Sequence, residues 1–208
     1  MKTSAAEHLL RADKKFARII KRVGACPIKP RRGVQPWQAL VRSVAYQQLN
    51  GRAAETIFKR FLALFPGSAF PTPGQILEMT DMRLRSAGLS RAKVAAIKDI
   101  AAKTIEGVVP DRRATSKCSD AEIIARLTTI RGVGPWTVEM LLMFTLARPD
   151  VLPVTDYGVR TGFAILHGLK KLPAPKELLA YGERWRPFRS AAAWYLWRVV
   201  DMAREGAK

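Results

Sequence analysis

The stretch IRGVGPWTV, residues 130–138, combines residue types that could hold a phosphate group. Gly132 and Gly134 flank Val133, and Pro135 follows at a position where a helix could begin. Glycines let a backbone come close to a bulky ligand, and the N-terminus of a helix offers unpaired amides and the positive end of a dipole. The stretch therefore suits the backbone of a nucleic acid, although a glycine-rich turn between two helices without any ligand has the same features.

The charge balance favours a polyanionic partner. Lys and Arg number 36 against 17 Asp and Glu, which gives a formal net charge of +19 over 208 residues. Each phosphate that such a surface neutralises releases counterions, so nucleic acid is the favoured partner, with generic surface charge or a ribosome-like role as the alternatives. No apolar run approaches the roughly 18 residues of a membrane span. Glu7 and Asp13 make the N-terminus a poor signal peptide, so we expect no membrane partner and a cytoplasmic, nucleoid-associated location.

The cysteine and histidine content limits metal chemistry. The chain has two cysteines, Cys26 and Cys118, far apart in the sequence, and two histidines. These are most simply free thiols of a reducing compartment. A zinc site or a four-cysteine iron–sulfur cluster is therefore excluded by count.

The elements that must position the glycine turn are predicted to be helices. Apolar residues recur at helical spacing from Trp37 through Leu40, Val44 and Leu49, which indicates a helix with one buried stripe. Further helices are predicted near residues 5–22, 52–64, 91–106, 119–128, 136–146, 156–168, 176–184 and 188–204. Segments rich in Pro and Gly separate them, and no alternating run is long enough for a sheet. The predicted fold class is all-α, as one large domain or two small lobes.

Five segments together resemble one protein family. LTTIRGVGPWTVEM resembles the helix-hairpin-helix of the HhH-GPD DNA glycosylase superfamily, and VLPVTDYGVR resembles its Gly/Pro-rich loop and aspartate, with Pro153 and Asp156 in those places. The segments 37–54, 87–101 and 181–197 extend the likeness in the family's order. The nearest branch is the alkylbase branch, 3-methyladenine DNA glycosylase II, in a compact form without the N-terminal mixed α/β domain.

This resemblance implies an architecture and an activity. It implies a bi-lobed helix-hairpin-helix fold with the active site in the cleft between the lobes. The whole chain, 1–208, would be one catalytic unit, with 37–146 as the central lobe that includes the hairpin and 1–36 plus 147–208 as the second lobe. The implied activity is monofunctional hydrolysis of the N-glycosidic bond of alkylated, 3-methyladenine-type bases in double-stranded DNA, by base flipping, as a monomer.

Asp156 is the catalytic residue that the resemblance implies. Cleaving a base from deoxyribose passes through a transition state with positive charge at C1′, which a carboxylate stabilises while it orients the attacking water. A base alkylated at a ring nitrogen is already cationic and leaves without a general acid, so one aspartate suffices. Spacing alone favours a helix N-cap for Asp156, and the two roles can coexist.

The base pocket and the wedge also rest on the resemblance. Trp197 takes the stacking position near the aspartate, where a cationic base is held by stacking and by cation–π attraction. The other expected pocket residues are Trp136, Tyr46 and Met140. Leu49 matches the intercalating wedge, with Gln48 beside it. The alternative for Trp197 is that its helix is simply buried between two layers of the protein. The alternative for Leu49 is that it is the last residue of the buried stripe that begins at Trp37.

The expected contacts with the DNA backbone surround the hairpin. They are Gly132, Val133, Gly134, Pro135, Thr137, Ser90 and Lys93. No organic cofactor is expected, and the resemblance suggests Na⁺ or K⁺ at the carbonyls of Ile130 and Val133. The lysine that bifunctional relatives carry just after the hairpin is replaced here by Trp136, which predicts no lyase activity. Two rival functions stay open: a non-enzymatic module for damaged or bent DNA, and a related glycosylase for mismatched or deaminated bases.

Overall fold

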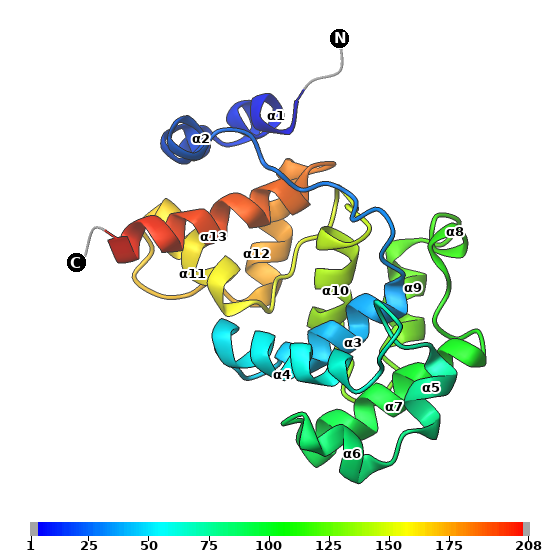
Figure 1. Cartoon of the computed structure of the whole chain (residues 1–208). Coiled ribbons are helices and arrows are strands. Elements are labelled where there is room, and N and C mark those ends of the chain that lie inside the picture. The colour runs from blue at the N-terminus through cyan, green and yellow to red at the C-terminus, as the bar shows by residue number, and fades with distance from the viewer. Residues whose placement is uncertain (1–3, 206–208) are drawn as a thin grey trace. The chain divides into compact units, whose positions relative to one another are not determined.

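The computed structural model describes residues 4–205, and every regular element in this range is a helix (Figure 1). The all-α prediction is thus confirmed. The chain divides into two compact units. Unit 1 comprises residues 1–30 and 142–208, and unit 2 comprises residues 31–141. No helix in the described range is long and apolar enough to cross a membrane.

Unit 1 is built from two stretches of chain that are far apart in the sequence. Its aromatic core joins Phe16, Trp185 and Tyr195, with ring centroids 5.5 Å and 6.0 Å from that of Phe16. The long helix α13 lies against α11, in red and yellow in Figure 1. The elements of unit 1 are α1 (Ala5–Ala12), the 3₁₀ turn η1 (Lys14–Phe16), α2 (Ala17–Val23), α11 (Tyr157–His167), α12 (Pro175–Gly182), the 3₁₀ turn η2 (Glu183–Trp185) and α13 (Arg189–Glu205).

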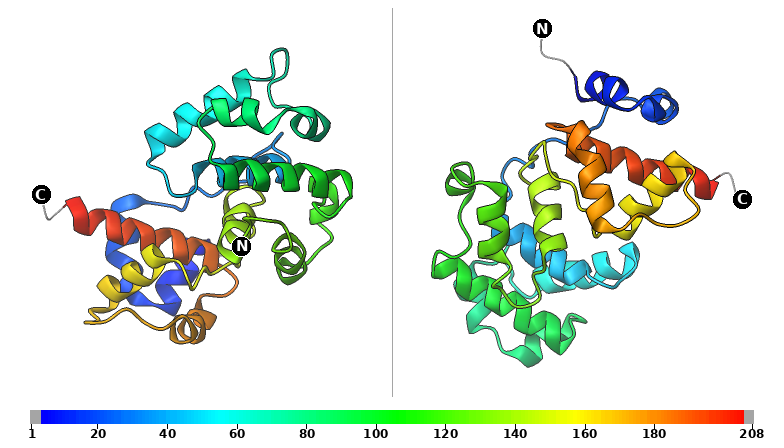
Figure 2. Two further views of the ribbon diagram at one scale, coloured as in Figure 1. Left: turned by 90° about the horizontal axis from the view of Figure 1, so that it is seen from below. Right: turned by 180° about the vertical axis from the view of Figure 1, so that it is seen from behind.

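Unit 2 is organised around α7 (Arg91–Ile105), which packs against α3 (Pro36–Tyr46), α5 (Pro73–Glu78) and α6 (Asp81–Ser86). Figure 2 shows the helices from two further sides. Its fully buried side chains include Leu40, Ile76, Ile97 and Ile100. The other elements are α4 (Gly51–Ala63), α8 (Arg112–Thr115) and α9 (Asp120–Leu127). Helix α10 (Pro135–Phe144) begins in unit 2 and its last residues belong to unit 1.

Two predicted helix boundaries are wrong, each for a local reason. The helix predicted at 5–22 is broken at Asp13, whose side chain accepts a hydrogen bond from the amide of Lys15 at 3.1 Å and so starts a new turn. The stripe helix predicted to reach Leu49 ends at Tyr46. Helices α5, α6 and α8 were not predicted, because they are too short to show a period and only their capping residues mark them.

A buried polar cluster connects the two chain stretches of unit 1. The Asp13 Oδ2 atom lies 3.3 Å from His167 Nε2 and accepts a hydrogen bond from the Tyr181 hydroxyl at 3.2 Å. Burial lowers the pKa of His167, and the neighbouring Asp13 carboxylate opposes this shift. No role is predicted for either histidine from the sequence, and Asp13, which lies beside His167, is far away from it along the chain.

Candidate DNA-binding and catalytic residues

The hairpin, residues 130–135, is a tight turn between α9 and α10. The side chains of Ile130 and Val133 point inward and are buried, and the Val133 amide donates to the Ile130 carbonyl at 3.1 Å. Gly132 has a φ of +73°, and a Cβ atom there would lie 2.9 Å from Ala96 Cβ. Both facts require glycine at this position. Pro135 is the first residue of α10, as predicted.

Two side chains of unit 2, those of Asp99 and Gln47, fasten this turn, and the sequence interpretation identified neither as functional. An Asp99 carboxylate oxygen accepts from the amide of Arg131 at 2.7 Å. The Gln47 side-chain amide donates to the Gly132 carbonyl at 3.1 Å and lies 3.4 Å from Thr137 Oγ1. Thr137 itself is buried, so its predicted contact with DNA would have to come from atoms other than this side chain.

Ser90 and Lys93 stand at the start of α7. The Ser90 hydroxyl caps the helix by accepting from the Lys93 amide at 3.2 Å. The Lys93 ammonium donates to the carbonyls of Ala45 at 2.9 Å and Gln47 at 2.8 Å, at the C-terminal end of α3. Burial lowers the pKa of Lys93. Two of its three N–H donors are thus used inside the protein, and one is left for the predicted phosphate contact.

The wedge loop, residues 47–50, follows α3 directly. Gln48 has a φ of 56°, and both Gln48 and Leu49 are exposed, Leu49 by 38%. The Asn50 side chain accepts from the Ala53 amide at 2.9 Å and starts α4. Leu49 therefore does not end the core stripe, and this alternative is wrong. Its role as a wedge stays a prediction.

The pocket residues predicted in unit 2 differ in exposure. Trp136 is the second residue of α10 and is 44% exposed, whereas Met140, one turn later, is half-buried. The Arg42 guanidinium lies over the ring of Tyr46, 4.3 Å from its centroid, and Phe58 contacts the same ring edge-to-face. Of the two aromatic side chains, that of Trp136 is therefore the more exposed.

Asp156 is the N-cap of α11. One carboxylate oxygen, Oδ1, accepts from the Val159 amide at 2.7 Å and from the Trp197 indole N–H at 2.9 Å. The N-cap interpretation is therefore confirmed. The structure also brings together Asp156 and Trp197, which the family resemblance placed near each other. This arrangement fixes the carboxylate at the positive end of a helix dipole, where an anion is favoured.

Close approach of α11 to α13 makes the bond between Asp156 and Trp197 possible. A Cβ atom on Gly162 would lie 2.1 Å from the backbone oxygen of Leu196, and one on Gly158 would lie 2.8 Å from Trp197 Cδ1. Phe144, which the sequence interpretation missed, packs beside the indole with ring centroids 5.8 Å apart. The glycines explain why the half-buried Trp197 reaches the first turn of α11.

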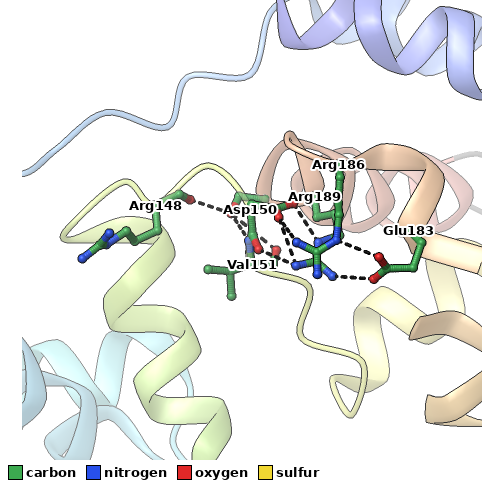
Figure 3. Close-up of polar contacts among 7 residues, drawn as sticks. Arg148, Asp150, Val151, Glu183, Arg186 and Arg189 are labelled. Atoms are coloured by element: carbon green, nitrogen blue, oxygen red, sulfur yellow. Dashed lines mark hydrogen bonds and ion pairs between the residues drawn. The ribbon is translucent and has the colours of Figure 1, made fainter. Parts of the chain in front are cut away.

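An ion network holds the segment that leads to Asp156 (Figure 3). Arg189, 8% exposed, donates to the Asp150 carboxylate at 2.7 Å and 3.1 Å and to the Asp150 backbone carbonyl at 2.9 Å. Its guanidinium also reaches Glu183 at 3.1 Å, and Arg186 bonds both carboxylates. A buried guanidinium with these partners satisfies the loop backbone and fixes its course toward Pro153.

The hairpin carbonyls are chemically compatible with a monovalent cation. The Ile130 carbonyl accepts one hydrogen bond in the turn and keeps a second lone pair. Oxygen donors of this kind suit hard cations such as Na⁺ or K⁺.

The chain matches known proteins along almost its whole length. Residues 41–187 match the HhH-GPD superfamily base excision DNA repair protein family. DNA-3-methyladenine glycosylase 1 of Schizosaccharomyces pombe is 42% identical over 204 residues, covering 97% of this chain and 89% of that protein. An alkylbase DNA glycosidase-like protein of the same organism is 31% identical, covering 97% of this chain and 95% of that protein.

Solved structures agree with these sequence matches. The S. pombe 3-methyladenine DNA glycosylase in complex with abasic DNA has a TM-score of 0.83 at 42% identity, covering 94% of this chain and 96% of that chain. A DNA-3-methyladenine glycosidase from Bacillus halodurans has a TM-score of 0.86 at 31% identity, covering 98% and 92%. The glycine hairpin, the loop with Asp156 and the all-helical units are thus parts of one known architecture, and the chain belongs to the HhH-GPD superfamily of base excision DNA repair proteins.

Proposed function

We propose that this protein is a monofunctional DNA glycosylase that removes alkylated, 3-methyladenine-type bases from double-stranded DNA in base excision repair, acting as a monomer. The observation that carries the proposal is the Asp156 carboxylate, held at the N-terminus of α11 by the Val159 amide and the Trp197 indole. Similarity to proteins named 3-methyladenine DNA glycosylases supports the substrate class.

The chemistry assigned to Asp156 is electrostatic. As the bond between C1′ and the base nitrogen breaks, its electron pair leaves with the base and positive charge develops on the sugar. The carboxylate stabilises that charge and orients a water, whose oxygen bonds to C1′ and whose proton passes to the carboxylate and from there to solvent. An alkylated purine is cationic before cleavage and leaves as a neutral base. Trp197 and Trp136 are the proposed stacking partners of the extruded base, and Leu49 the proposed filler of the gap.

The absence of lyase activity follows from the residue after the hairpin. Trp136 stands where the resemblance places a lysine in bifunctional relatives, and an indole cannot form a Schiff base with C1′. The reaction needs no organic cofactor. Na⁺ or K⁺ at the carbonyls of Ile130 and Val133 would add positive charge beside a bound phosphate.

The test compares the wild-type protein with Asp156→Asn on methylated duplex DNA. Asparagine caps helices as well as aspartate does, and its oxygen can accept both hydrogen bonds, so the variant removes the charge and keeps the fold. We expect wild type to release methylpurines, and the variant to be slower by roughly 10²- to 10⁴-fold. Chromatography of the released bases measures this, and a gel run without alkali detects strand cleavage.

A matched control is Asp111→Asn, which changes another aspartate N-cap, at α8, in the same way. It should keep wild-type activity. If wild type and Asp156→Asn are equally active, Asp156 caps the helix and has no role in catalysis. If both bind DNA but neither releases a base, the non-enzymatic binding module takes the place of this proposal. Strand cleavage without alkali would contradict the monofunctional assignment.

A further inference from the structure

The wedge loop and the hairpin are tied together by hydrogen bonds within unit 2. The Gln47 side chain leaves the wedge loop and its amide nitrogen donates to the hairpin carbonyl of Gly132 at 3.1 Å. The same nitrogen lies 3.4 Å from the hydroxyl of Thr137 in the first turn of α10. One side chain thus spans residues that are 85 positions apart in the sequence.

The orientation of this side chain is set by its partner. A carbonyl oxygen can only accept a hydrogen bond, so the nitrogen of the Gln47 amide, and not its oxygen, must face Gly132. The contact is therefore specific for an amide. A carboxylate in the same place would set oxygen against oxygen.

Both ends of the bridge are themselves held. The Lys93 ammonium donates to the backbone carbonyl of Gln47 at 2.8 Å and to that of Ala45 at 2.9 Å, which fixes the point where the wedge loop leaves α3. On the other side, Asp99 accepts from the Arg131 amide at 2.7 Å. Lys93 and Asp99 both lie on α7, so one helix braces the two ends.

We propose that Gln47 is a positioning residue that holds the wedge loop in register with the hairpin, so that the backbone grip and the insertion of Leu49 act on the same nucleotide step. This inference rests on the proposed function, because it takes Leu49 as the gap filler. When the hairpin binds the duplex at one phosphate, the gap left by the extruded base lies at a fixed distance from the hairpin. A small displacement of the side chain that fills this gap is expected to lower the excision rate by a large factor.

The decisive variant is Gln47→Glu, which keeps the shape and reverses the polarity of the contact. Gln38→Glu is the matched control. It makes the same change in α3, the helix that precedes the wedge loop, where the Gln38 side-chain oxygen accepts from the Gln35 amide at 2.9 Å and a glutamate oxygen can do likewise. Gln47→Met, which has no donor and no charge, is the second variant. Melting temperatures show whether each variant is folded.

Two readouts separate positioning from binding. One is the affinity for an undamaged duplex, which depends on the contacts of the hairpin with the DNA backbone. The other is the fluorescence of 2-aminopurine beside a tetrahydrofuran abasic site, which rises when a side chain enters the stack. We expect Gln47→Glu to reduce the fluorescence response and the single-turnover excision rate by roughly 10-fold or more, while its Kd for undamaged DNA stays within about twofold of that of Gln38→Glu.

A double-mutant cycle with Leu49→Ala completes the test. If Gln47 acts by placing Leu49, the two substitutions are non-additive, and Leu49→Ala has little further effect on fluorescence in the Gln47→Glu protein. Additive effects, or a Gln47→Glu protein that matches Gln38→Glu in fluorescence and rate, would overturn the inference. The fluorescence cycle needs no excision, so a wild type that inserts Leu49 but releases no base would defeat the proposed function and leave this inference standing.

Discussion

Asp156 is the N-cap of α11 and the proposed catalytic group, and the two hydrogen bonds that its Oδ1 atom accepts differ in what they contribute. The Val159 amide belongs to the cap that any aspartate can make, whereas the Trp197 indole comes from a different helix, 41 residues away. A cap needs only the first of these contacts. The second aligns the carboxylate with an aromatic side chain proposed to hold the base, so the indole is the more informative partner.

We expect Trp197→Phe to slow excision more than it weakens DNA binding. Phenylalanine keeps an aromatic face but cannot donate to Asp156, so the carboxylate loses its alignment. The expected loss is roughly 10-fold in single-turnover rate, with the Kd for undamaged duplex unchanged within about twofold. Trp194→Phe on the same helix is the control, because Trp194 packs on Tyr195 and Arg198 and has no proposed part in the reaction. A wild-type rate in Trp197→Phe would show that the indole N–H is dispensable.

At the scale of elements, the spacing of α11 and α13 depends on glycine. Gly158 and Gly162 lie one turn apart on the face of α11 that meets Leu196 and Trp197 of α13. Without a Cβ atom on this face, the two helix backbones come close enough for a side chain of one to reach the cap of the other. The proposed active-site geometry is in this sense a consequence of helix packing.

We therefore expect Gly162→Ala mainly to lower the stability of the fold and Gly158→Ala mainly to lower the activity. In Gly162→Ala the new Cβ meets a backbone oxygen at 2.1 Å, which cannot move without separating the helices. We expect a loss of about 3 kcal/mol or more in the free energy of unfolding. In Gly158→Ala the clash is with the Trp197 side chain, so activity should fall while most of the stability is kept.

Denaturant unfolding and excision rates on both variants check this prediction. Gly74→Ala is the control, since its nearest neighbour is Thr72 Oγ1 at 4.0 Å and alanine suits a helix. Its stability should be equal to that of wild type or higher by up to about 1 kcal/mol. A Gly162→Ala protein of wild-type stability would mean that α11 and α13 tolerate a wider spacing.

At the scale of the whole molecule, we expect the excess of positive charge to govern the affinity for DNA. A formal net charge of +19 predicts DNA binding that weakens steeply with salt, because bound phosphates release counterions. With about 6 to 10 phosphate contacts, the Kd should rise by roughly 10³- to 10⁵-fold between 50 and 200 mM salt. Fluorescence anisotropy on an undamaged duplex over this range measures the slope.

The hairpin's share of that slope can be isolated with Arg131→Gln. Arg131 is exposed and lies in the hairpin, so its loss should reduce the slope of log Kd against log salt by about one. Lys59→Gln is the control, because the Lys59 ammonium already pairs with Glu55 at 2.9 Å. An affinity that hardly changes with salt would contradict a binding mode based on the phosphate backbone.

The sequence by itself determined the helical class, most helix positions and the place of the hairpin. These depend on local rules: apolar residues at helical spacing define a buried stripe, and proline at a first turn or glycine at a positive φ acts within a few residues. Leu49 shows the limit of such rules, since periodicity extended the α3 stripe to a residue that the structure exposes.

Only the tertiary structure decided which side chains meet. One hydrogen bond joins Gln47 to Gly132, 85 positions along the chain, and another joins Trp197 to Asp156, 41 positions away. Asp13 and His167, which lie together in the buried cluster, are 154 positions apart. No periodic pattern encodes such pairs, because they depend on how closely helices pack and on which buried donors find acceptors. The residues that could do chemistry are visible in the sequence, whereas those that hold them in place become visible only after folding.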